Sequence, residues 1–206
     1  MSAMQDDPIF DTLRKHITPA TIQQLSTAIG ADPEKTSKAV GLALPTLLGA
    51  LSRNASNPQG AASLDRALDD HDGGILDDLG GLLGGGGGAM GGIGGAILGH
   101  VLGRRQAPVE QGLGKASGLN AQQIGTLLAM LAPIVMGVLG RMKQQQGIDA
   151  SRLPNVLENS TKRMEKETPG VGGLAGMLDA NNDGQIADDL ARMGSSVLGG
   201  LFKNKR

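Results

Sequence analysis

The residues best suited to bind a ligand form an acidic segment near the C-terminus, residues 179–190. This segment opens like an EF-hand or dockerin-like calcium loop, with oxygen donors at positions 1, 3 and 5, a glycine at the turn and a backbone carbonyl at position 7. The predicted calcium ligands are Asp179, Asn181, Asp183 and Gln185. Position 12 holds Leu190 instead of a bidentate carboxylate. An Asx turn that caps the following helix is therefore the alternative interpretation.

Motifs for catalysis are missing from the sequence. His16, His71 and His100 lack the HxxxH or HExxH spacing of a zinc site. The sequence has no G-x-S-x-G element, and its glycine-rich segment lacks the Lys-Ser/Thr pair of a phosphate loop. We therefore expect no enzyme, no catalytic residues and no cofactor other than the calcium considered above.

A glycine-rich tract over residues 79–103 contains thirteen glycines and no formal charge. Small residues four apart share one face of a helix and let a second helix approach closely. The predicted self-association face consists of Gly87, Gly91, Gly95, Gly99 and Gly103. The tract is long enough to span a bilayer, but each glycine costs a helix about 1 kcal/mol relative to alanine, and no aromatic belt is present. A linker, or a close-packed helix in a soluble assembly, is favoured over a membrane span.

The segment from Ile22 to Val40, with Gly30 between two predicted helices, has the spacing of a helix-turn-helix motif. A helix that reads DNA must present basic and polar groups to the groove. Only Lys35 and Lys38 supply cations before the second helix becomes apolar. Two helices packed in a core are therefore favoured over DNA binding, and nucleic acid is not a favoured partner.

An internal repeat appears when the sequence is shifted by 88 positions. The shift places Gly30, Pro45, Gly49 and Arg53 on Gly118, Pro133, Gly137 and Arg141. After an insertion, residues 72–79 match residues 183–190, and both read D-G-x-I-x-D-D-L. We interpret the chain as two copies of one module. The predicted division is a first helical module at 1–78, a glycine-rich bridge at 79–106 and a second helical module at 107–206, which contains the acidic D-x-N-x-D-G loop.

Both copies are predicted to be helical, with no clear place for a strand. Thr18 caps a helix that Gly30 ends, and Asp32 begins a second helix, which contains Pro45. In the second copy, Asn120 caps a helix from about residue 121 to 143, which contains Pro133. Each internal proline should kink its helix. Further helices are expected near residues 59–68 and 150–166.

The segment LALPTLLGALSRNASNP, followed by the D-G-x-I-x-D-D-L element and the glycine-rich tract, resembles the bacterial DUF937 family, which includes YidB-like proteins. The resemblance covers roughly residues 8–79 and, more weakly, 109–190. That family has no known function, and its fold is described as homeodomain-like. The resemblance therefore implies an all-α fold and supplies no catalytic residues.

Composition narrows the class of protein further. The chain has no cysteine, a formal net charge of -1 and only Phe10 and Phe202 as aromatic residues, so stacking platforms for bases or sugars are missing. The N-terminus lacks a basic and then apolar run, which predicts no signal peptide and a cytoplasmic location. We expect a structural or interaction protein that forms homo-oligomers through its apolar helices and the glycine tract. A calcium-binding or envelope-associated binding module is the alternative, and a membrane partner is possible but not favoured.

Overall fold

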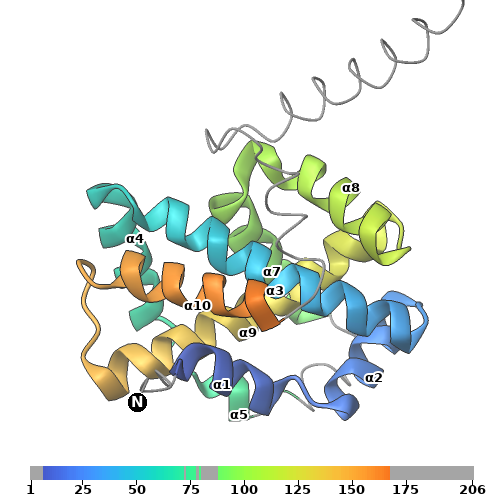
Figure 1. Cartoon of the computed structure of the whole chain (residues 1–206), viewed down its shortest axis with the longest axis horizontal. Coiled ribbons are helices and arrows are strands. Elements are labelled where there is room, and N and C mark those ends of the chain that lie inside the picture. Colours follow the sequence, from blue (N-terminus) through green and yellow to red (C-terminus); the bar gives the residue numbers. More distant parts are fainter. Residues whose placement is uncertain (1–6, 72, 78, 80–87, 168–206) are drawn as a thin grey trace, which may run out of the picture.

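The computed structural model describes residues 7–71, 73–77, 79 and 88–167. Within these ranges the regular elements are all helices, which confirms the all-α prediction (Figure 1). The α-helices are α1 (Pro8–His16), α2 (Pro19–Ile29), α3 (Pro33–Ala55), α4 (Pro58–Asp69), α5 (Gly74–Asp77), α7 (Gly88–Val101), α8 (Gln106–Ser117), α9 (Ala121–Gln146) and α10 (Leu153–Glu167). A 3-10 turn, η1 (Gly103–Arg105), joins α7 to α8.

The helix boundaries follow the predicted capping residues closely. The Thr18 hydroxyl accepts a hydrogen bond from the Thr21 backbone N–H at 3.2 Å, and Gly30 ends α2 with a φ of 61°. The Asn120 side chain caps α9 through the Gln123 N–H at 2.8 Å. Gly118 ends α8 with a φ of 79°. Both glycines have the left-handed conformation that a residue with a side chain rarely adopts, so they are strong stop signals.

Two contacts between the copies correspond to each other under the shift of 88 residues, which places Lys35 on Gln123 and Gly30 on Gly118. The Gln123 side chain of α9 donates to the carbonyl of Gly30 at 3.1 Å, at the end of α2. Reciprocally, the Lys35 side chain of α3 lies 3.9 Å from the place that a Cβ on Gly118 would occupy. Reciprocal contacts of this kind are expected between two copies related by an approximate two-fold axis. Duplication and homeodomain-like modules remain predictions from the sequence.

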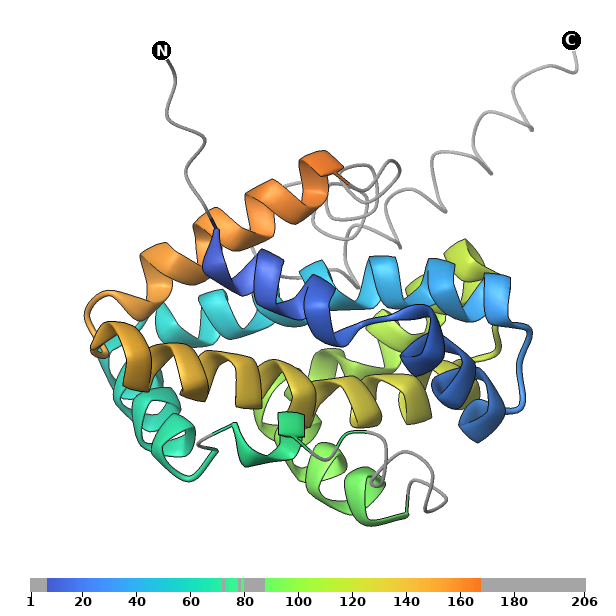
Figure 2. The ribbon, with the colours of Figure 1, turned by 90° about the horizontal axis from the view of Figure 1, so that it is seen from below.

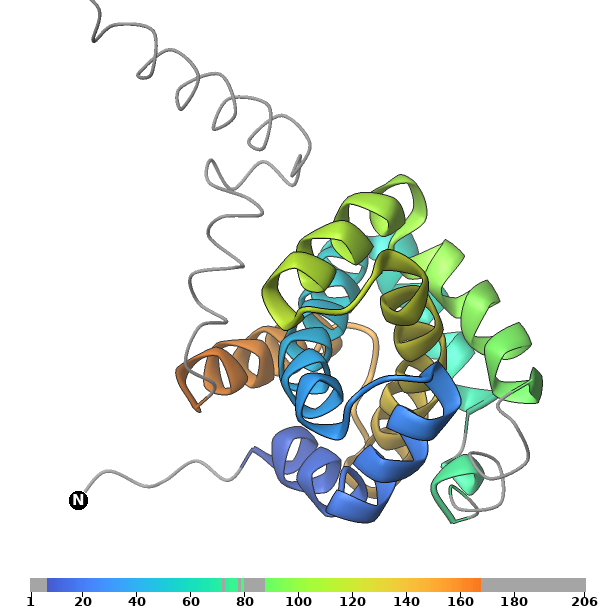
Figure 3. The same ribbon diagram turned by 90° about the vertical axis from the view of Figure 1, so that its right-hand side faces the viewer.

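The longest helix, α9, lies at the centre of the described structure. It packs against α1, α2, α3, α4, α5, α7 and α8. Figure 2 shows it crossing the molecule, and Figure 3 shows α7 and α10 on opposite sides of it. One hydrophobic cluster contains residues from both predicted modules and from the predicted glycine-rich bridge, which contributes Leu98 and Leu102. Leu47 and Leu48 of α3, and Leu127 and Leu128 of α9, are at most 2% exposed.

This burial corrects one part of the sequence interpretation. The two apolar helices were expected to supply surface for self-association, but α3 and α9 are buried within their own chain. Among the described residues, α9 is the one helix that is both long enough and apolar enough to cross a membrane. However, 83% of its most apolar stretch is buried inside the protein. Its burial therefore identifies α9 as a core helix of the described structure.

Small residues on α9 allow the first D-G-x-I-x-D-D-L element to approach its backbone. A Cβ at Gly137 would lie 2.7 Å from a methyl carbon of Ile75, and a Cβ at Gly140 would lie 1.7 Å from the carbonyl oxygen of His71. Arg141 then holds the element in place by donating to the Gly73 carbonyl at 2.9 Å and to Asp77 at 2.7 Å. The described part of this element therefore has a packing role.

The end of α1 lies close to this ion pair. Burial, and secondarily the Arg141 guanidinium, lowers the pKa of His16 below its ordinary value, although Asp77 opposes the change. The folded protein therefore favours neutral His16. This contribution to stability is fully present above the unfolded pKa of about 6.5 and is lost as the pH falls through the lower folded pKa.

We therefore predict a histidine-dependent loss of stability in mild acid. Between about pH 7.5 and pH 5, the melting temperature of the wild type should fall further than that of His16→Gln, because the variant has no imidazole to protonate. Thermal unfolding followed by circular dichroism measures both. Equal losses in the two proteins would show that His16 does not contribute.

Candidate functional site

The described part of the glycine tract is the helix α7, which lies against α9. Six of its fourteen residues are glycine, and none is Asp, Glu, Lys or Arg. One of these glycines makes the contact possible, because a Cβ at Gly94 would lie 1.6 Å from the carbonyl oxygen of Ala129. Leu98 of α7 is 1% exposed in the same packed region. Residues 88–101 are thus a docked helix and not a linker.

The predicted self-association glycines lie on another face of this helix. Among the described residues, no atom lies within 4 Å of the place that a Cβ would occupy at Gly91, Gly95, Gly99 or Gly103. Gly95 and Gly99 are exposed and Gly91 is half-buried. Gly103 begins the 3-10 turn with a φ of 51°, so the helical row runs over the other three. Gly87 lies outside the described residues.

One exposed apolar side chain lies on the same helix. Ile93 is 52% exposed, and among the described residues it is the one large hydrophobic residue that is exposed. The glycine spacing did not predict an exposed Ile93, since spacing alone does not say which side of α7 meets α9.

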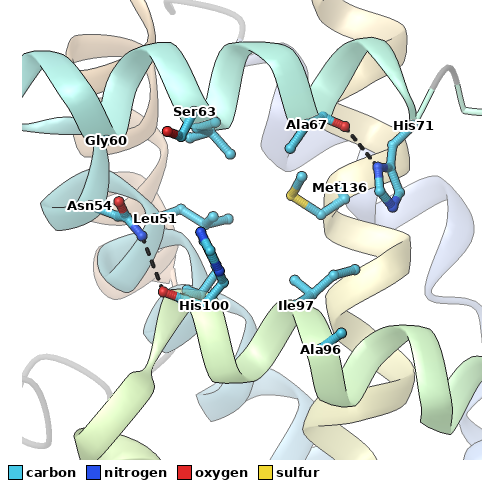
Figure 4. Close-up of a pocket in the computed structure, with 12 residues that line it drawn as sticks. Leu51, Asn54, Gly60, Ser63, Ala67, His71, Ala96, Ile97, His100 and Met136 are labelled. Carbon is cyan, nitrogen blue, oxygen red and sulfur yellow. Dashed lines mark hydrogen bonds between the residues drawn. The ribbon is translucent and has the colours of Figure 1, made fainter.

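A hollow of about 300 Å³ opens between α3, α4, α7 and α9. Figure 4 shows α4 on one side and α7 on the facing side, with Leu51 of α3 and Met136 of α9 at the two ends. Leu51, Leu64 and Met136 are buried, and we call this buried apolar part of the lining, which includes both ends, the floor; Ser63 and His100 are exposed and form the rim. We call this hollow the pit.

Two hydrogen bonds fix the polar groups around the pit. The Asn54 amide donates to the backbone carbonyl of His100 at 3.3 Å, which ties α3 to the end of α7. The ring Nδ1 of His71 lies 2.7 Å from the carbonyl oxygen of Ala67. Because a carbonyl can only accept, Nδ1 carries the proton, and Nε2 of a neutral ring is an acceptor. The lining residues are spread along the chain from Leu51 to Met136, so no local motif could have predicted the pit.

The predicted calcium ligands Asp179, Asn181, Asp183 and Gln185 lie outside the described residues. Near the equivalent first-copy element, Lys143 contacts Asp65 at 2.9 Å and Asp69 at 2.7 Å. Although burial opposes the charge, the hydrogen bonds that Lys143 donates to the Asp69 and Asp65 carboxylates raise its pKa. Over residues 7–71, 73–77, 79 and 88–167, no group of three or more His, Cys, Asp or Glu residues could hold a metal ion. These two carboxylates therefore pair with a lysine in the described structure.

The fold and the sites described so far define an all-helical protein with a docked glycine helix and an apolar pit. Residues 11–142 match the profile of the DUF937 family, described as a bacterial protein family of unknown function. The matched range covers more than half of the chain, so the chain belongs to the DUF937 family. No curated protein and no solved structure shows a significant match to it.

Adjacent glycines of α7 should respond oppositely to the same substitution. Gly94→Ala places a methyl group against the α9 backbone and should destabilise the protein by about 1–3 kcal/mol. Gly95→Ala meets no atom of the described residues within 4 Å and, at concentrations too low for copies to associate, should stabilise the chain by up to about 1 kcal/mol, because alanine favours the helix. Each kcal/mol of stability shifts the melting temperature by roughly 2–4 °C, so melting curves distinguish the two variants. If Gly94→Ala is as stable as the wild type, α7 does not pack on α9 through Gly94.

Proposed function

We propose that this protein is a non-enzymatic structural protein that self-associates through α7, with α7 of one copy packed against α7 of another. The observation that supports this proposal is the open row formed by Gly91, Gly95 and Gly99 on an exposed, uncharged helix. Successive glycines in this row are rotated by only about 40° around the helix axis, so the row forms a shallow track.

The composition of α7 is otherwise difficult to explain. Six glycines cost the helix roughly 6 kcal/mol relative to alanine. Gly94 is needed for contact with α9, but the open row has no partner within the described chain that requires small residues. A second backbone that approaches along this track would gain dispersion contacts over its whole length. The row would then serve the interface between copies.

Charge favours an antiparallel pair of α7 helices. Residues 88–101 have no charged side chain to desolvate when two copies meet. Arg104 and Arg105 lie in the 3-10 turn shortly after α7 and are both exposed. An antiparallel pair places the two Arg104-Arg105 segments at opposite ends of the interface, which separates like charges. Such an arrangement has two-fold symmetry and closes as a dimer.

Light scattering tests the proposal with two matched variants. The wild type should contain dimers at tens of micromolar, and Gly95→Glu should be monomeric, because a charge in the contact cannot be buried without a partner. Ala62→Glu adds the same charge at an exposed position on α4 and should dimerise as the wild type does. Both variants should keep the wild-type helix content by circular dichroism.

A monomeric wild type at that concentration would overturn the proposal. So would a Gly95→Glu variant that associates as strongly as Ala62→Glu.

A further inference from the structure

We propose that the pit binds a small, uncharged amphiphile, namely a single alkyl chain of about eight carbons that ends in a hydroxyl group. The inference concerns a different part of the surface from the α7 glycine row and does not depend on self-association. It rests on the shape of the pit, its lining and the hydrogen-bonding groups at its rim.

The shape of the pit favours a small molecule over a docked helix. Figure 4 shows side chains on all four sides, because Leu51 and Met136 close the ends of the space between α4 and α7. A helix with side chains is about 10 Å wide and needs an open-ended groove. The volume of about 300 Å³ is at the lower end of the range for ligand pockets. At roughly 30 Å³ per non-hydrogen atom, it holds about ten such atoms.

The lining of the pit changes from polar at the rim to apolar at the floor. Leu51, Leu64 and Met136 are buried at the floor, and Ile97 and Val101 are half-buried in the wall. These side chains favour an alkyl chain, since each methylene group that leaves water adds to the free energy of binding. None of the described residues that line the pit is Asp, Glu, Lys or Arg. A charged head group would therefore find no ion-pair partner in the lining.

The rim offers hydrogen bonds that suit a hydroxyl group. Within the described chain, the Ser63 hydroxyl and the His100 ring have no hydrogen-bond partner, and Figure 4 shows the His100 ring on the pit side of α7. The Ser63 hydroxyl can donate or accept, and a neutral imidazole offers one donor and one acceptor. A ligand hydroxyl also does both, whereas a carboxylate only accepts. The chain end would therefore lie in the apolar floor and the hydroxyl at the rim.

Methyl NMR of the full chain with labelled methionines tests the site directly, with 1-octanol as the probe. Met136 lies at the floor of the pit, and Met164 on α10 is a buried reference away from it. Met136→Leu assigns the first resonance. We expect octanol to shift the Met136 signal saturably at about millimolar concentration or below, and to leave Met164 unchanged. Octanoate near pH 8 should bind at least about fivefold more weakly, because its charge is unpaired in the pit.

Two substitutions on α4 provide the matched comparison. Ala67→Leu fills the pit and should abolish the octanol-dependent shift, whereas Ala62→Leu adds the same group at an exposed position outside it and should bind normally. An unchanged Met164 signal shows that each variant is folded. His100→Ala, at the exposed rim, should weaken binding about three- to tenfold through loss of one hydrogen bond.

Three results would overturn the proposal: equal shifts at Met136 and Met164, normal binding by folded Ala67→Leu, or octanoate that binds as tightly as octanol. Gly95→Glu should bind octanol like the wild type. Failure of self-association and failure of the pit are thus measured separately.

Discussion

The described structure depends on burying α9 on nearly all of its sides. This helix has 26 residues, and from Ile124 to Met142 most of them are apolar and buried. A helix that is hydrophobic all round cannot lie at a protein surface, so it must be surrounded. Seven helices pack against it. Bulky side chains at every contact would keep the neighbouring helices too far from α9. Instead, the backbone of α7 approaches α9 at Ala129, and the backbone of the turn after α4 approaches it at Gly140.

Burial of α9 also determines how α7 is displayed. The close approach of Gly94 to Ala129 orients α7 so that its second set of glycines faces outward. The same residue type therefore has two roles on one helix, one in packing within the chain and one that we assign to contact between chains. The pit follows from the same arrangement, because α4 and α7 flank α3 and α9 without closing the space between them.

Local features of this fold could be predicted from the sequence. Thr18, Gly30 and Asn120 act at helix ends, where one side chain or one backbone conformation decides the structure. Of the five glycines that the four-residue spacing selected, Gly91, Gly95 and Gly99 lie on one open face of α7.

Features that depend on several distant segments could not be predicted. Sequence spacing did not reveal that α3 and α9 bury each other, because an apolar helix reads the same whether its partner is in its own chain or in another. Nor did it single out Gly94 from its neighbours, or bring His71 and His100 to one pit, since these contacts depend on tertiary packing. The identities at Gly137 and Arg141 were visible as repeat positions, but their contacts with Ile75 and Asp77 were not.

Cysteine cross-linking between copies tests most directly whether α7 meets α7, because the natural chain contains no cysteine. Gly95 is the middle residue of the open row, so it lies closest to the two-fold axis of the proposed dimer. Two Cβ atoms about 4 Å apart can form a disulfide. Under mild oxidation, Gly95→Cys should form a covalent dimer much faster than Ala62→Cys on α4. Equal rates for the two variants, or no dimer from Gly95→Cys, would contradict self-association through α7.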